Sequence, residues 1–225
     1  MATRSVRLVA LANGARRSGF YLWRRLNSLT VDRVTLAIIG AGNVQCSSPV
    51  LATIASYFGE RPLDVVLYDA DEERLDLFDR LARTFFAFTK SGNTLASTTN
   101  ADEALAEAEL VIVQLDRHGA IKALGPKNSS AKNILGRALA KLLANASPSA
   151  EVLSLMDESV ELPVPSFRRL TWPKPVNENE TVAVPHQALR WIHGEEYPFE
   201  FFAEHEDSPL KLWLDDPKTA TLAKG

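Results

Sequence analysis

Two glycines and an aspartate are the residues of this chain best suited to chemistry. Gly40 ends the apolar run VTLAII and permits a tight turn, and Gly42 leaves room for a pyrophosphate to approach the backbone. The N–H groups of the helix that follows favour negative charge at this point. Asp69 ends the next apolar run, LDVVLY, where a carboxylate accepts hydrogen bonds from ribose hydroxyls and repels a 2′-phosphate. The pattern therefore predicts a dinucleotide site that prefers NAD to NADP.

The glycine turn is incomplete, because Gln45 occupies the position where a third glycine is expected. Two other interpretations therefore stay open. In one, a Rossmann-like scaffold binds no cofactor, the glycines serve only the turn, and Asp69 caps the next helix. In the other, a different nucleotide or an adenosyl group occupies the turn. The residues that distinguish these cases are Gln114, Leu115 and Asp116, where a nicotinamide ribose would lie.

Strands and helices must alternate to position these residues. Apolar runs typical of buried strands occur at 34–40, 63–71, 93–99, 109–116, 150–157 and 167–172. Helical patterns occupy 49–58, 71–90, 101–108 and 129–146. In the first helix Ser48 is the expected N-cap, and Leu51, Ile54 and Phe58 are expected on its inward face. In the second, Leu75, Phe78 and Phe85 are expected to face the core.

This alternation predicts an α/β fold, a doubly wound and mostly parallel Rossmann sheet of strand order 3-2-1-4-5, with the sixth run as a possible further strand. The proline-rich stretch 163–175 is expected to be irregular chain that closes the domain. Three parts are expected: a basic N-terminal extension at 1–33, the Rossmann domain at 34–175, and an acidic, aromatic C-terminal extension at 176–225.

Three stretches resemble the N-terminal domain of the NAD-dependent glycoside hydrolases, whose superfamily includes the lactate and malate dehydrogenases. They are VTLAIIGAGNVQCSSPVLATIASYF, VVLYDADEERLDLF and STTNADEALAEAELVIVQL, and together they cover roughly residues 34–116. The resemblance implies that the fold binds NAD. The residues implied at the cofactor are Gly40, Gly42, Asn43 and Val44 around the pyrophosphate, Asp69 on the ribose, and Gln114 towards the nicotinamide.

The catalytic part of that family is not recognisable. In those hydrolases the fifth strand leads to an Asn-Pro and then to a Cys and a His that bind a divalent metal, whereas here it leads to SLMDESVELP. The dehydrogenases use a histidine and an acid from a second domain, for which too few residues follow the fifth strand. Glycoside hydrolase activity and a metal site are therefore not expected. Two functions therefore remain open. The chain is either an oxidoreductase, or one subunit of one, or a non-catalytic module that senses a nucleotide or assists assembly.

Candidate acid–base residues are few. His118 and Asp116, in LDRHGA, follow the fourth strand at the cofactor end of the sheet and are the best placed, although a solvated loop histidine is the alternative. His186 and His193 lie on one face of a helix at a spacing too wide for a tight metal site, so a surface helix is expected.

Composition narrows the class further. A net charge of −3 over 225 residues does not favour a nucleic-acid-binding protein. The single cysteine, Cys46, excludes an internal disulfide and indicates the cytoplasm. No run of roughly 18 apolar residues is present, so no transmembrane segment is expected.

The two ends of the sequence carry opposite charge. Residues 1–31 hold six arginines and no acid, whereas residues 194–216 hold eight acids and one lysine. Both segments contain large apolar side chains, among them Trp23 and Trp213. We expect the two segments to pack together, within one chain or between subunits of a homo-oligomer, or else to bind a protein partner. The arginines are also typical of an organelle transit peptide, and that interpretation stays open.

Overall fold

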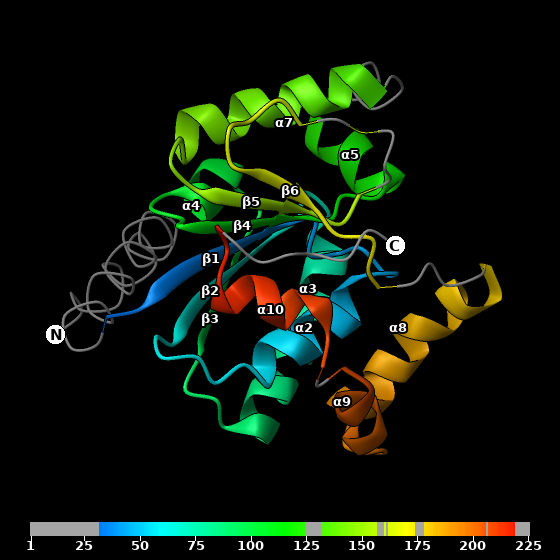
Figure 1. The fold of residues 1–225 in the computed structure, drawn as a ribbon. Coiled ribbons are helices and arrows are strands. Elements are labelled where there is room, and N and C mark those ends of the chain that lie inside the picture. Colours follow the sequence, from blue (N-terminus) through cyan, green and yellow to red (C-terminus); the bar gives the residue numbers. More distant parts are fainter. Residues whose placement is uncertain are drawn as a thin grey trace, which may run out of the picture. The chain divides into compact units, whose positions relative to one another are not determined.

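A six-stranded, wholly parallel sheet forms the centre of the molecule (Figure 1). The computed structural model describes residues 32–124, 132–156, 160, 162–173, 178–205 and 207–218. Its strands are β1 (Val34–Ile39), β2 (Leu63–Tyr68), β3 (Thr94–Thr98), β4 (Leu110–Val113), β5 (Glu151–Ser154) and β6 (Phe167–Arg169). Their order is β3-β2-β1-β4-β5-β6, which confirms both the predicted order and the sixth strand. The fold is therefore of the doubly wound Rossmann class.

Helices cover both faces of this sheet, which explains why its strands are apolar without alternation. On one face lie α2 (Ser47–Ala55) and α3 (Glu72–Thr89), and on the other lie α4 (Ala101–Leu105), α5 (Arg117–Leu124) and α7 (Lys132–Ala146) (Figure 1). In β1 the side chains from Leu36 to Ile39 are at most 1% exposed. The predicted inward residues of α3, Leu75, Phe78 and Phe85, are all buried.

The chain after β6 continues the same apolar core. Helices α8 (Glu178–Ile192), α9 (Phe199–His205) and α10 (Pro209–Asp215) pack on the face that α2 and α3 form. Trp213 is fully buried there, and Phe85 of α3 contacts Trp191 and Phe202 at ring distances of 5.6 and 4.9 Å. Truncation of one large buried aromatic side chain to alanine costs roughly 3–5 kcal/mol. The acidic, aromatic segment therefore packs against its own chain, while residues 1–31, its expected complement, lie outside the described residues.

Helix α2 differs from its predicted limits. It begins at Ser47, with Cys46 at the N-cap, and it ends at Ala55, so the prediction of Ser48 as N-cap was wrong. The Ser47 hydroxyl instead donates to the carbonyl of Ala41, which fixes the helix to the turn before it. Because the helix stops early, Phe58 does not reach the inward face and is 66% exposed. No helix in the described ranges is long and apolar enough to cross a membrane.

Candidate functional site

Gly40 begins the turn at the carboxyl end of β1, and two features of the structure require glycine at this position. Its φ is +89°, a conformation that L side chains rarely adopt. A Cβ atom there would lie 2.8 Å from the backbone of Leu115, which follows β4. The N–H groups of Gly40 and Ala41 both donate to the carbonyl of Tyr68, at the end of β2. The turn is thus tied to both neighbouring strands.

Asp69 binds the turn directly. Its Oδ2 accepts from the Gly42 N–H at 2.8 Å, and its Oδ1 accepts from the Asp71 N–H at 2.9 Å. The residue is 1% exposed. Burial raises the pKa of Asp69 above its ordinary value, although the two N–H groups oppose that shift by stabilising the charged form. The carboxylate therefore already has two donors within the protein.

Gly42 provides space that the protein itself uses. A Cβ atom on Gly42 would lie 2.6 Å from Cβ of Arg74 and 2.8 Å from Oδ2 of Asp69. The space that the sequence suggested for a pyrophosphate is therefore filled, on this side of the turn, by Arg74 of α3 and by Asp69, which follows β2.

Asn43 and Gln114 lock the turn to β4. Asn43 donates to the carbonyl of Gln114 at 2.5 Å and accepts from the Gln45 N–H. Gln114 donates to the Gly40 carbonyl and to the Ser47 hydroxyl, and it is 1% exposed. Its Oε1 is buried and has no partner within the described chain. One acceptor is therefore left over in an otherwise satisfied network.

Two backbone donors also remain. Within the part of the chain that the structure describes, the N–H groups of Val44 and Ser48 make no hydrogen bond, whereas those of Asn43, Gln45 and Ser47 are satisfied by turn contacts. Both lie at or just before the start of α2, where the helix dipole favours an anion. These donors are the part of the turn that can bind a phosphate.

Helix α5 closes over this turn, although the sequence predicted a loop there. Arg74 of α3 pairs with Asp116 at 2.7 Å, and His118 of α5 pairs with Asp71 at 2.6 Å. We name these two contacts the α3–α5 bridge. Because α3 follows β2 and α5 follows β4, the bridge crosses the carboxyl end of β1, which lies between them. Gly119 of α5 continues this cover, since a Cβ on it would lie 3.9 Å from Oδ2 of Asp69.

The contacts of the bridge change the pKa of one of its acids, Asp71. The pKa of Asp71 is lowered to about 2, chiefly by the hydrogen bond from His118. The Arg74 N–H and Lys122 contribute to this shift, and burial opposes it. Asp71 also caps α3 by accepting from that N–H. His118 and Asp116, the acid–base candidates of the sequence, contact different partners, Asp71 and Arg74 respectively. Asp116 also accepts from the Gly119 N–H at 2.6 Å and holds the first turn of α5.

Sequence reasoning missed Arg74 and Asp71, the α3 partners in the bridge. Both stand in the quoted stretch DADEERL, one helical turn apart, so an aspartate cap followed by an arginine was visible. The aspartate of LDRHGA, with a glycine three residues later, also fits an N-cap and would have indicated α5. The sequence could not show that the start of α3 and the start of α5 contact each other across the carboxyl end of β1.

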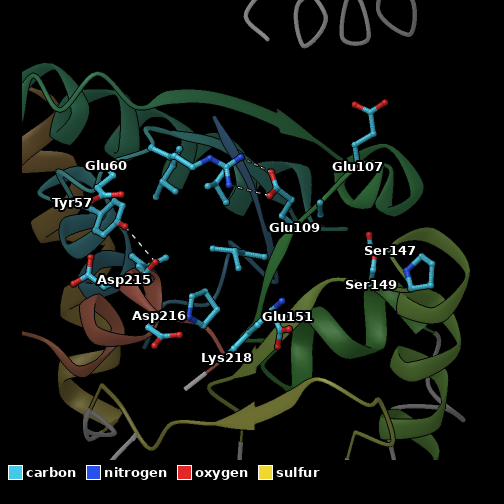
Figure 2. Close-up of a pocket in the computed structure, with 18 of the residues that line it drawn as sticks. Tyr57, Glu60, Glu107, Glu109, Ser147, Ser149, Glu151, Asp215, Asp216 and Lys218 are labelled. Carbon is cyan, nitrogen blue, oxygen red and sulfur yellow. Dashed lines mark hydrogen bonds and ion pairs between the residues drawn. The ribbon is translucent and has the colours of Figure 1, made fainter. Parts of the chain in front are cut away.

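A hollow lies at the opposite edge of the sheet, where the strands begin (Figure 2). Its volume is about 770 Å³, and the first residues of β1, β2, β4 and β5 line it. The labelled acids around it are Glu60, Glu107, Glu109, Glu151, Asp215 and Asp216. Arg61 pairs with Glu109 at 3.4 Å, and the Tyr57 hydroxyl donates to the Leu214 carbonyl. Open parallel sheets bind ligands at their carboxyl ends, so this acidic hollow is on the wrong edge for a nucleotide.

The other histidines are not arranged around a metal. His193 lies 3.8 Å from Glu195, and both side chains are more than half exposed. Among the described residues, no group of three His, Cys, Asp or Glu side chains is placed to hold a metal ion. Cys46 is buried, and this burial raises the pKa of its thiol to about 12, which favours the neutral thiol.

The fold and the turn define a Rossmann-type protein. The model of the family 4 glycosyl hydrolases matches residues 35–124. This match confirms the resemblance that the sequence showed over residues 34–116, and it ends at the last residue of α5.

Solved structures of two related groups are similar to part of the chain. A 6-phospho-alpha-glucosidase from gut microorganisms, in complex with NAD and Mn2+, is 17% identical with a TM-score of 0.44, over 55% of this chain and 32% of its own. A 6-phospho-beta glucosidase from Thermotoga maritima, with manganese, NAD+ and glucose-6-phosphate, is 17% identical with a TM-score of 0.42, over 56% and 35%. A lactate dehydrogenase from Cryptosporidium parvum, with lactic acid and nicotinamide adenine dinucleotide, is 18% identical with a TM-score of 0.41, over 57% and 39%. The chain thus spans between 32% and 39% of these proteins.

Proposed function

We propose that this chain is a dinucleotide-binding Rossmann module that takes NAD at the turn Gly40–Val44. The observation that carries the proposal is the pair of unused N–H groups of Val44 and Ser48 at the start of α2. Backbone donors at a helix N-terminus suit a pyrophosphate, and the other donors of the turn are consumed within the protein. The match of residues 35–124 to family 4 supports the same placement.

Two buried acceptors fit the sugars of such a ligand. Gln114 Oε1 has no donor in the described chain, so it would accept from the hydroxyl of the nicotinamide ribose. Asp69 would hold the adenosine ribose, since each of its oxygens has a second lone pair. Because Asp69 is 1% exposed beneath α5, NAD would reach it only when the α3–α5 bridge opens. NAD supplies hydride chemistry when bound, and a partner would have to supply a substrate domain.

Calorimetric titration with NAD, NADH, NADP and adenosine monophosphate tests the proposal. The decisive variant is Val44→Pro, which removes one unused N–H. Val44 is the second residue of a turn closed by the Cys46 N–H and the Asn43 carbonyl, a position that suits proline. We expect Val44→Pro to weaken NAD binding about ten-fold, and Val44→Ala, which keeps the N–H, to bind as the wild type does. Equal affinities in the two variants would refute this placement.

The choice of Val44 avoids a structural side effect. Gly42→Val, the obvious test from the sequence, would push a side chain into Arg74 and Asp69 and disturb the turn itself. NADP must be compared with NAD in these titrations, because Arg74 lies beside Asp69 and an arginine beside the ribose carboxylate is suited to a 2′-phosphate. NAD should bind more tightly than NADP if Asp69 faces the ribose.

The second candidate function is a non-catalytic Rossmann module that assists assembly. The observation in its favour is that Asp69 already accepts two N–H groups and lies beneath the bridge. His118, the best acid–base candidate of the sequence, is also turned towards Asp71 and α3, away from β5. If none of the four nucleotides binds, this second function replaces the first, and the glycines serve the turn alone.

A further inference from the structure

A cavity of about 680 Å³ adjoins the N-terminus of α2, between Val44 and Gln45 of the turn, this helix, the chain after β6, and helices α8 and α9. This volume suits a small organic molecule. Flat aromatic or apolar groups form most of its wall: Val44, Pro49, Trp172, Pro173, Val184, Trp191 and Phe201. Trp191 and Phe201 contact each other with ring centroids 4.7 Å apart. The cavity therefore favours a flat, apolar molecular body.

Two of the lining residues hold buried polar atoms without a partner. Trp191 is 7% exposed and Ser48 is 4% exposed, and neither Trp191 Nε1 nor Ser48 Oγ has a hydrogen-bond partner in the described chain. Buried polar groups are normally satisfied, so two exceptions on one cavity call for an explanation. The Ser48 N–H, also unused, adds a third donor from the same helix end.

The charges around the cavity define which end of a ligand these donors would meet. Indole N–H and backbone N–H groups can only donate, and the first turn of α2 carries the positive end of its dipole. His205 is held by a hydrogen bond from Nδ1 to the Phe201 carbonyl at 2.7 Å. Glu204 is the acid that lines the cavity, and its side chain is exposed to water. The polar end of a ligand should therefore be an anionic acceptor beside Ser48 and Trp191.

We propose that this cavity binds a small aromatic carboxylate. The ring lies among Trp172, Trp191 and Phe201, where offset or edge contacts between aromatic groups are favourable. The carboxylate accepts from the Trp191 indole N–H and from the N–H and hydroxyl of Ser48. Trp191 Nε1 and Ser48 Oγ have almost no accessible surface in the structure, so the side chains around them must shift for the carboxylate to reach them. A bound carboxylate would then satisfy polar atoms that no contact within the described chain satisfies.

Isothermal titration of the full chain with 2-naphthoate tests this proposal, with 2-naphthalenemethanol as a neutral compound of similar shape. We expect naphthoate to bind at least ten-fold more tightly than the alcohol. Trp191→Phe keeps an aromatic ring but removes the donor, and should weaken naphthoate binding about ten-fold. Trp213→Phe is the matched control, because Trp213 Nε1 is also buried without a partner in the described chain but does not line this cavity. It should leave the affinity unchanged.

Ser48→Ala provides an independent variant if Trp191→Phe does not fold, which its thermal unfolding curve will show. It should weaken naphthoate binding several-fold. Absence of naphthoate binding, equal binding of the alcohol, or equal losses in Trp191→Phe and Trp213→Phe would each overturn the proposal. The Ser48 N–H is also one of the two donors proposed for the pyrophosphate, and Val44 lines the cavity, so NAD and naphthoate should compete. No nucleotide is present in these titrations, so failure of naphthoate to bind would refute the cavity proposal and leave NAD binding at Gly40–Val44 untouched.

Discussion

The start of α2 lies between two regions that treat polar atoms in opposite ways. On the glycine-turn side, Asp69, Asn43 and Gln114 make hydrogen bonds to the turn itself. On the cavity side, Ser48 and Trp191 keep buried polar atoms without partners in the described chain, among aromatic side chains. A satisfied network holds the chain in one conformation, whereas unsatisfied groups cost free energy until a ligand meets them. Asp69 and Asn43, which the sequence placed at the ligand, therefore hold the turn itself. The polar groups without partners in the described chain are Gln114 Oε1 and the Val44 N–H on the turn side, and Ser48 and Trp191 on the cavity side.

Gly40→Ala is the variant from which we expect the largest loss of stability. The turn should tolerate no side chain there, because φ is +89° and a Cβ would lie 2.8 Å from the Leu115 backbone. We expect a loss of about 3–5 kcal/mol in the free energy of unfolding, from backbone strain and overpacking together. Urea unfolding measures it.

Gly92→Ala is the matched control for this substitution. Gly92 has a φ of +75° but open space where a Cβ would stand, so only the conformational cost applies, about 1 kcal/mol. Equal losses at the two positions would show that the contact with Leu115 does not constrain the turn.

Asp69→Ala should have the next largest effect. The substitution leaves the buried N–H groups of Gly42 and Asp71 without their acceptor, while it removes the cost of burying a carboxylate. We expect a net loss of about 2 kcal/mol in the free energy of unfolding. An unchanged urea midpoint would mean that the carboxylate is not holding the turn, and would return Asp69 to a role in ligand binding alone.

The sequence predicted the sheet well because buried parallel strands are apolar runs and because helix α3 has one apolar face. VTLAII and LVIV are recognisable for this reason, and Gly40 marks the turn between strand and helix. Helix α5 was missed because RHGAIKAL has a glycine and only two large apolar residues, and because its start depends on capping by Asp116. Local pattern fails where a single side chain decides whether a helix begins.

The candidate site was harder to predict than the fold. Gly40, Asp69 and Gln114 do meet at the carboxyl end of β1, as the topology required. Their hydrogen bonds, however, depend on which donors the folded turn leaves near them. The cavity beside α2 depends on residues far apart in the sequence, such as Ser48, Trp172 and Trp191, and spacing carries no information about such encounters.

The α3–α5 bridge predicts a smaller, pH-dependent effect. The pKa of Asp71 falls from 3.8 to about 2 in the folded protein, so its contribution to stability is complete above 3.8 and is lost as the pH falls through about 2. Asp71→Asn keeps an acceptor for the helix cap but removes the charge that faces His118 and Lys122. We expect this variant to lose about 1 kcal/mol near neutral pH, because its partners are half exposed. The difference from wild type should shrink on acidification, as urea unfolding at a series of pH values will show; a constant difference would place the effect in the cap instead.

The smallest predicted effect concerns the affinity of the cavity for 2-naphthoate in the variant Glu204→Gln. Glu204 lines the cavity with its carboxylate in water, and it would repel the carboxylate of a bound ligand weakly. Glu204→Gln should therefore tighten 2-naphthoate binding about two-fold, a change typical of exposed charges. Because salt screens such charges over about 10 Å at 0.1 M, the gain should disappear at high ionic strength. Binding of 2-naphthalenemethanol should not change in the variant, since it carries no charge. If Glu204→Gln instead weakened naphthoate binding, Glu204 would be accepting a hydrogen bond from the ligand, and the ligand's polar end would need a donor as well as an acceptor.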